Sequence, residues 1–497
     1  MRCSLRVTAL AGVFAMFACG GSGTAPQTLS FTIGRDSTLL LDEVDSLAAF
    51  KENGVRVPAA SLTWRSSAPA VASVDANGRV TALSKGLATI YASSSGAAEH
   101  ISITVVPQFY VISTGETHTC GITGRSQIYC WGLSQDGELG SATAMQQCPE
   151  LGVPCSTKPV LATHMSLSSV VTGARFTCAL DASSAAYCWG ANFYGQLGNG
   201  GTSQNSTPQL VSGGHQFSQL VAGRFHACGI TVTQDAYCWG WDHAGQLGAG
   251  DVSSERCTFF SSDPCSTTPR LVTGAQKWAL LSATDRATCG LTTSGVAYCW
   301  GLDVGGNDGL YCQSSDDLIG CAHAPIQVGS DHLFRNISIG NVHRCEQTAD
   351  EKIECWGANY FGAYGSGTLT QSDTAVQAAG GAAYLSFVAS RLGTCGLENS
   401  GRVQCWGNDV YGQVGNGVMK DAQLAPDDVS GGYTFESLAT GGGSDHVCGI
   451  TREGRALCWG WGDFGQLGNG ALLNSSTPQF VQLVPAPPLA GSVIAAR

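Results

Sequence analysis

One unit recurs seven times along the chain and restricts its fold more than any other feature. Each copy has two cysteines with nine residues between them, Trp-Gly directly after the second cysteine, and a Gly-x-x-Gly that begins seven residues after it. The second cysteines recur every 50 to 61 residues, which is typical of propeller blades rather than of helical solenoids. The seven pairs are Cys120 and Cys130, Cys178 and Cys188, Cys228 and Cys238, Cys289 and Cys299, Cys345 and Cys355, Cys395 and Cys405, and Cys448 and Cys458.

The spacing inside each copy predicts a stapled hairpin. Between Cys448 and Cys458, Gly454 ends a three-residue turn and can take a positive φ. Such a turn sets the two cysteines opposite each other on neighbouring strands, about 4.5–5.5 Å apart between Cα atoms, within reach of a disulfide. The Trp after the second cysteine then points to the other face, where its ring can fill the gap between adjacent sheets. The sequence thus predicts seven hairpin disulfides and seven inter-sheet tryptophans.

Composition restricts the compartment and the partners. Charged residues make up 12% of the chain, about half the usual share, and 66 residues are Gly. The net charge of −12 argues against a nucleic-acid partner, for which a basic surface is expected. Twenty-two cysteines indicate an oxidising compartment.

The N-terminus explains that compartment. Residues 1–18 read as a signal peptide, with a basic start and an apolar stretch too short to span a bilayer. The following Met16-Phe17-Ala18-Cys19 resembles a bacterial lipobox, which implies lipidation at Cys19, and residues 19–26 then form a flexible tether. This resemblance implies an extracytoplasmic protein anchored at the cell envelope, on the outer membrane or surface. A plain secretory signal and a secreted protein are the alternative.

Residues 27–107 lack cysteine and the repeat. Strand-length runs separated by turn residues predict a small β-sandwich. The segments Trp64-Arg-Ser-Ser, Asn77-Gly-Arg-Val-Thr-Ala and Lys85-Gly-Leu-Ala-Thr-Ile resemble the group 2 bacterial immunoglobulin-like domain. In surface proteins such domains act as spacers, and a direct adhesive role is the alternative.

Residues 108–484 contain the repeats. Four copies place His two residues before the first cysteine, at His118, His226, His343 and His446. Together with Trp-Gly and Gly-Gln-Leu-Gly-Asn-Gly, this pattern resembles the regulator of chromosome condensation repeat family. The resemblance implies an all-β chain whose repeats form a seven-bladed propeller of four-stranded blades. The histidines are expected to form hydrogen bonds within each blade rather than to bind metal.

The ends of this region predict how the ring closes. The strand Ser476–Val481 follows the last copy, and the first copy begins without such a strand. We therefore expect the C-terminal strand to complete the first blade and leave no open edge. Residues 485–497 are expected to form a disordered tail.

Candidate binding residues lie where the copies differ, because loops on a rigid scaffold carry function. Three copies have a longer connection with its own cysteine pair: Cys148 and Cys155, Cys257 and Cys265, and Cys312 and Cys321. These insert loops are expected to project from one face as a binding surface, or only to suppress fraying of long loops. A second set could stack on sugars, anchor a protein, or only pack the loops. It comprises Phe193, Tyr194, Trp241, His243, Tyr360, Phe361, Tyr411, Trp461 and Phe464.

No catalytic, metal or cofactor motif is visible in the sequence. The leading hypothesis is a monomeric, non-enzymatic, lipid-anchored binding protein whose propeller face captures a protein or glycan, with the lipid as its only contact with membrane. The alternatives are a structural envelope protein without a discrete ligand and a propeller enzyme that acts on polysaccharide. The family includes the exchange factor of a nuclear GTPase, but an exported, acidic protein is not expected to meet such a partner.

Overall fold

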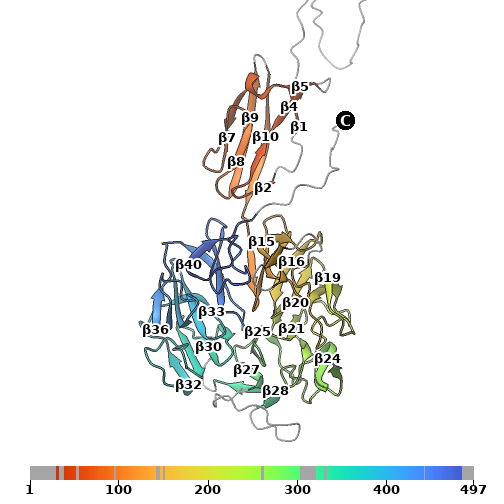
Figure 1. Cartoon of the computed structure of the whole chain (residues 1–497), viewed down its shortest axis with the longest axis vertical. Coiled ribbons are helices and arrows are strands. Elements are labelled where there is room, and N and C mark those ends of the chain that lie inside the picture. Colours follow the sequence, from red (N-terminus) through yellow and green to blue (C-terminus); the bar gives the residue numbers. More distant parts are fainter. Residues whose placement is uncertain are drawn as a thin grey trace, which may run out of the picture.

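The computed structural model describes residues 29–483 apart from short gaps, and within them the chain is almost entirely β-strand (Figure 1). The gaps are residues 33–37, 52–54, 95–96, 141–145, 149–151, 259–261, 303–320, 330–332 and 442. Its one helical element within the described residues is the 3-10 turn η1 (Ala59–Ser61).

The N-terminal segment forms a sandwich of small sheets. One sheet contains β2 (Thr38–Leu40), β10 (Ala97–Val106), β9 (Gly86–Ser94) and β6 (Thr63–Ser66). A second contains β3 (Val44–Ser46), β8 (Arg79–Ala82) and β7 (Ala72–Val74), and a third contains β1 (Leu29–Thr32), β4 (Ala48–Lys51) and β5 (Arg56–Val57). Alternate residues of β9 and β10, such as Ile90 and Ile103, are buried against Val80, as expected of strands with one face on a core.

In the part of the chain that the structure describes, the repeats form seven antiparallel sheets, which we number 1 to 7 in chain order. Sheet 1 is β11 (Val111–Thr114), β12 (His118–Ile122), β13 (Ile128–Leu133), β15 (Val153–Leu161) and β14 (Gln146–Cys148). Sheet 2 is β16 (Leu167–Thr172), β17 (Phe176–Asp181), β18 (Ala186–Gly190) and β19 (Asn205–Leu210). Sheet 3 is β20 (Phe217–Ala222), β21 (His226–Thr231), β22 (Ala236–Trp241), β24 (Ser262–Leu271) and β23 (Arg256–Thr258). Sheet 4 is β25 (Trp278–Ala283), β26 (Ala287–Thr292), β27 (Ala297–Leu302) and β28 (Cys321–Val328).

Sheets 5 to 7 follow the same order. Sheet 5 is β29 (Asn336–Ile339), β30 (His343–Gln347), β31 (Ile353–Gly357) and β32 (Ser372–Gln377). Sheet 6 is β33 (Tyr384–Ala389), β34 (Gly393–Glu398), β35 (Val403–Asp409) and β36 (Lys420–Asp428). Sheet 7 is β37 (Phe435–Ala439), β38 (His446–Thr451), β39 (Ala456–Gly460) and β40 (Ser475–Phe480).

The sheets are arranged in a closed ring (Figure 1). The first strand of each sheet lies innermost and contacts the first strand of the next, from β11 through to β37, and β37 contacts β11 again. The fold is therefore an all-β propeller, as the repeat pattern predicts.

All seven predicted hairpin disulfides are present, with Cα atoms 4.0 to 4.1 Å apart. This separation is slightly shorter than the range expected from the sequence and close to that of a non-hydrogen-bonded antiparallel pair. In sheets 1 to 7 the bonds are Cys120–Cys130, Cys178–Cys188, Cys228–Cys238, Cys289–Cys299, Cys345–Cys355, Cys395–Cys405 and Cys448–Cys458.

The second cysteine of each pair lies directly opposite the first in the strand register. Cys130, Cys188, Cys238, Cys299, Cys355, Cys405 and Cys458 all occupy the third strand of their sheets, one residue before the Trp. The turn between the two strands takes a positive φ in every copy, at Gly295, Gly401 and Gly454 and also at the non-glycine residues Ser126, Ser184, Gln234 and Glu351. The turn therefore fixes the register that brings each pair together.

The tryptophans join neighbouring sheets, as predicted. The indole of Trp189 in sheet 2 is buried and donates a hydrogen bond of 3.0 Å to the carbonyl of Glu138 in sheet 1. A Cβ added at Gly140 would lie 2.9 Å from this indole, which explains why the Gly-x-x-Gly ends in glycine. The same arrangement closes the ring, because Trp131 of sheet 1 donates to Gln466 of sheet 7 at 2.8 Å and packs against Gly468.

The prediction that the C-terminal strand completes the first blade is wrong. β40 pairs with β39 as the outermost strand of sheet 7, and sheet 1 obtains its outer strand, β15, from its own repeat. Each repeat thus makes one whole sheet. The ring closes through side-chain contacts between sheets 7 and 1 rather than through strand exchange.

The sandwich is docked on the ring where sheets 1 and 7 meet (Figure 1). Arg455 forms two hydrogen bonds of 2.8 and 2.9 Å with the carboxylate of Asp42, and Arg125 forms an ion pair of 2.7 Å with Glu43. The backbone N–H of Gln108 donates to the carbonyl of Gly454 at 2.9 Å. Arg125, Gly454 and Arg455 belong to turns between the second and third strands of their sheets, so the sandwich contacts that end of the ring, which we call the joint face.

Several expectations fall outside the described residues: the signal peptide, lipidation at Cys19, the tether, the C-terminal tail and Cys312 of the third insert pair. Within the part of the chain that the structure describes, no helix has the length and apolar character needed to cross a bilayer.

Candidate functional site

The face opposite the joint carries the variable loops. In an antiparallel sheet of four strands, the turn between strands one and two and the connection between strands three and four leave from the same end. The first group includes residues 173–175 and 284–286, and the second holds the Gly-x-x-Gly and the insert loops. We call this end of the ring the insert face.

Two insert loops are stapled hairpins on this face. β14 pairs with β15 and β23 pairs with β24, each beyond the outer edge of its sheet. The disulfides Cys148–Cys155 and Cys257–Cys265 close them, with Cα atoms 5.7 and 5.9 Å apart. Both therefore extend the ring on the insert face as short, covalently closed structures.

Part of the predicted aromatic set forms a cluster across sheets 2, 3 and 4. Trp241, which is 8% exposed, lies 5.7 Å from Tyr194 between ring centroids and stacks at 10° on His243. Phe225 contacts both Tyr194 and Trp241, and the Arg286 guanidinium lies 5.5 Å from the Trp241 ring. These rings pack mainly against one another, while His243 stays 44% exposed.

A second cluster joins sheets 6 and 7. Trp461 lies 5.8 Å from Tyr411 and 5.0 Å from Phe464, and its indole donates to Asp463 at 2.8 Å. Tyr360 lies elsewhere on the insert face and is 51% exposed, whereas Phe193 and Phe361 are half-buried. The structure thus divides the predicted set into two packed clusters, an exposed tyrosine and two half-buried phenylalanines.

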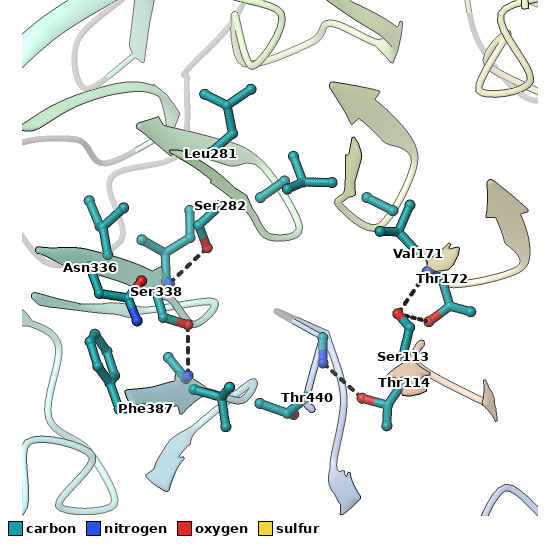
Figure 2. Close-up of a pocket in the computed structure, with 18 residues that line it drawn as sticks. Ser113, Thr114, Val171, Thr172, Leu281, Ser282, Asn336, Ser338, Phe387 and Thr440 are labelled. Carbon is teal, nitrogen blue, oxygen red and sulfur yellow. Dashed lines mark hydrogen bonds between the residues drawn. The ribbon is translucent and has the colours of Figure 1, made fainter. Parts of the chain in front are cut away.

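The central channel is lined by hydroxyl and apolar side chains (Figure 2). It encloses about 250 Å³, and its lining residues come from the innermost strands of sheets 1 to 6 and, in sheet 7, from Thr440 and Gly441, directly after β37. The hydroxyls join neighbouring strands: Ser113 accepts from the N–H of Thr172 at 3.1 Å, and Ser338 accepts from Ala389 at 2.8 Å. No carboxylate occurs among the eighteen lining residues drawn in Figure 2, so the acids that a channel hydrolase would need are not found there.

The repeated histidines mainly bridge neighbouring sheets, whereas the sequence predicted hydrogen bonds within each blade; His446 also contacts Ser444 of its own sheet, with Nδ1 3.0 Å from the hydroxyl oxygen. His118 Nε2 lies 2.9 Å from the hydroxyl of Thr177 in the next sheet, and His446 lies 2.7 Å from Thr119 across the closing gap. Burial lowers the pKa of both imidazoles to about 3. They are therefore neutral structural bridges at physiological pH.

A buried carboxyl occupies the corresponding layer of sheet 1. Glu138 stands where Gln196 and Gln246 stand in sheets 2 and 3, and like them it accepts a backbone N–H two residues before it, at 2.8 Å. Burial raises the pKa of Glu138 from 4.5 to about 8. The carboxyl is therefore neutral at neutral pH and resembles the glutamines of the other copies.

We expect Glu138→Gln to stabilise the protein increasingly as pH rises from about 4.5 to 8. In this window the unfolded chain releases a proton that the folded chain keeps, so wild-type stability falls with pH, whereas the amide does not titrate. The gain at pH 8 should be about 4 kcal/mol, measured as the difference in free energy of unfolding in urea. The reverse change, Gln196→Glu, should produce the mirror-image loss. A difference between Glu138→Gln and wild type that does not vary with pH would show that Glu138 is ionised in the folded state.

Sequence reasoning missed the residues that the turns between strands one and two bring to this face. Phe225 and Arg286 occupy the position just before that of the repeated His, as Arg175 does in sheet 2. This position changes from copy to copy within a regular motif, and that variation was a usable signal. This position lies far in the sequence from the loops that follow Trp-Gly, but the structure places it beside them.

Comparison with known proteins agrees with this class of fold, a β-sandwich followed in the sequence by a propeller built of repeats. The regulator of chromosome condensation (RCC1) repeat matches residues 184–230 and 453–489, and a second description of the same repeat matches 167–196, 217–246 and 439–466. The intimin immunoglobulin-like domain matches residues 59–96. The chain therefore carries RCC1 repeats preceded by an immunoglobulin-like domain.

Individual relatives are distant. The ultraviolet-B receptor UVR8 of Arabidopsis thaliana is 25% identical over 380 residues, which cover 74% of this chain and 68% of the receptor. The human E3 ubiquitin-protein ligase HERC2 is 26% identical over 352 residues, 66% of this chain. The chain spans only 7% of HERC2 and 10% of the human ligase HERC5.

Solved structures share the fold. Human WBSCR16 has a TM-score of 0.60 at 19% identity, covering 72% of this chain and 94% of that one. Yeast RCC1 (Prp20), bound to Kap60, has a TM-score of 0.58 at 22% identity, covering 72% and 84%. At these identities the likeness concerns the fold alone.

Proposed function

We propose that this protein is a non-enzymatic extracytoplasmic binding protein that presents its insert face to a protein or glycan. The observation that carries the proposal is that the joint face and the insert face lie at opposite ends of the sheets. The sandwich is fixed to the joint face by Asp42 and Glu43, and both described insert hairpins extend the other face. A sandwich that connects the ring to an anchor on Cys19 would therefore leave the insert face accessible.

The nature of the fold and its disulfides supports this function. Nine disulfides occur among the described residues, and an oxidising compartment is needed to form them. Yeast RCC1 is seen bound to Kap60, and another structure of Prp20p concerns its binding to Gsp1p and histones. Those partners are proteins, which supports a propeller of this type as a binding scaffold.

Removing the insert hairpins should abolish partner capture. We expect the full chain, immobilised in oxidised form, to retain a partner from envelope extracts or a glycan array. A variant with the two described insert loops shortened to the length of the sheet 2 connection should lose it, because stapled loops are preorganised for binding. Substitution of Val232 by Ala, in an exposed turn of the joint face, is the matched control and should retain the partner.

The result also separates the alternatives. Equal capture by the trimmed chain would place the binding site elsewhere and contradict the proposal. Capture by neither chain would favour a structural envelope protein without a discrete ligand.

A further inference from the structure

The gap between sheets 4 and 5 differs from every other gap in the ring. In four gaps the repeated His meets a Thr of the next sheet: His118–Thr177, His226–Thr288, His343–Thr394 and His446–Thr119. Two further gaps have apolar residues at these positions, Phe176 with Ala227 and Gly393 with Val447. The gap between sheets 4 and 5 instead has Ala287 and Arg344. Ala287 and Arg344 thus replace the His–Thr bridge or the apolar pair that the other gaps have at these positions.

A cavity of about 570 Å³ opens at this position on the insert face. Its walls include Ala287, Arg344 and the turns of sheets 4, 5 and 6 that carry Arg286, Asn341 and Arg391. The exposed Tyr360, one of the aromatic residues that the sequence singles out, also belongs to the wall. The volume lies in the range of small-ligand sites.

The described walls of the cavity are cationic in a protein that is acidic overall. Among the described lining residues, the guanidiniums of Arg286, Arg344 and Arg391 are accompanied by one carboxylate, Asp285. Asp285 lies 3.9 Å from Arg286 and 3.8 Å from Arg224, so its charge is shared. Arg344 is 6% exposed and Arg391 is 46% exposed, so one guanidinium lies deep and another lies near solvent. Planar guanidiniums bind carboxylates through paired hydrogen bonds.

We propose that this cavity binds an acidic sugar, with the uronate carboxylate held by Arg286, Arg344 and Arg391 and the ring stacked on Tyr360. An exposed aromatic ring beside fixed polar groups suits a flat sugar face. The described walls consist largely of turns and strand ends, which favours a compact ring over an extended peptide that would add to a sheet edge. This inference rests on the proposed function, since it names a ligand for the insert face.

Calorimetric titration of the full chain with trigalacturonate tests the proposal. Binding should weaken with added salt, and the methyl ester of the same trisaccharide, which lacks the charge, should not bind. R286A and R391A should each weaken binding about tenfold or more, because each removes a charged hydrogen-bond donor. Y360A should weaken it less. R175A is the matched control, because Arg175 holds in sheet 2 the position that Arg286 holds in sheet 4, and it should bind as wild type does.

Arg391 also pairs with Asp445 at 3.1 Å, so R391K and thermal melts of all variants distinguish lost binding from lost folding. The proposal is overturned if trigalacturonate gives no heat, if its methyl ester binds equally well, or if tetraglutamate binds more tightly than the sugar. If partner capture still depends on the insert loops in that case, the proposed function stands and only the acidic-sugar inference fails. If neither the sugar nor a partner binds, the inference and the proposed function fail together.

Discussion

The double variant with Cys228→Ala and Cys238→Ala should lose about 2–3 kcal/mol of unfolding free energy relative to the oxidised wild type. The disulfide closes a loop with a sequence separation of 10 residues, and both cysteines are fully buried. In the chain-entropy model a loop of this length restricts the unfolded chain by about that amount. Urea unfolding followed by tryptophan fluorescence measures the difference.

The insert disulfide Cys148–Cys155 provides the comparison. It closes a hairpin beyond the outer edge of sheet 1, where opening is expected to stay local. Its double alanine variant should therefore lower the global free energy of unfolding less than the variant without Cys228 and Cys238 does. Equal unfolding curves for the wild type and the variant without Cys228 and Cys238 would refute a stabilising role of the hairpin disulfides.

Replacing Trp131 by Ala should destabilise the whole ring by about 3–5 kcal/mol, the range for a buried large-to-small substitution. The Trp131 side chain is fully buried, contacts Phe109 and reaches sheet 7 through its hydrogen bond to Gln466. The variant loses the packing and leaves the carbonyl of Gln466 without that donor. Thermal and urea unfolding of the full chain measure the loss.

An internal gap supplies the control for ring closure. Trp239 makes the same contact between sheets 2 and 3, donating to Gln196 at 3.0 Å. If the ring is closed as described, Trp131→Ala and Trp239→Ala should cost similar amounts. A much smaller loss of unfolding free energy for Trp131→Ala would mean that sheets 7 and 1 do not pack against each other as sheets 2 and 3 do. Trp461→Ala, which alters only a half-buried indole of a surface loop, should cost less than either.

The local structure of each repeat could be predicted from the sequence because it depends on short-range spacing. Nine residues between cysteines allow one hairpin with the pair in register, and the residue after the second cysteine must face the other way. The disulfides, such as Cys178–Cys188, and the role of residues such as Trp189 follow from these two facts.

The phase of the repeat could not be predicted in the same way. A cyclic pattern has the same period wherever the unit is taken to begin, so the Thr-Pro strand could belong to the sheet before it or after it. The structure assigns Ser475–Phe480 to sheet 7, and the side-chain bridges of Trp131 and His446 close the ring without it.

Contacts between repeats were also beyond the sequence. The bridge from His118 to Thr177 spans 59 residues, and the turn that carries Arg391 meets the cavity of sheets 4 and 5 only after the ring has formed. The predicted aromatic residues lie in the loops of one face, and their role in binding stays a prediction. Their division into packed clusters depends on Phe225 and Arg286, which lie in a different part of the repeat.

Site-specific photo-crosslinking of the full chain tests the central claim, that binding uses the face opposite the joint. A photoreactive phenylalanine at position 243 would report on the insert face, and one at position 232 on the joint face of the same sheet; both native residues, His243 and Val232, are exposed. In envelope extracts or with a glycan ligand, adducts should form at position 243 and not at position 232. Adducts at position 232 alone would contradict the account and place the partner on the face that the immunoglobulin-like domain shares.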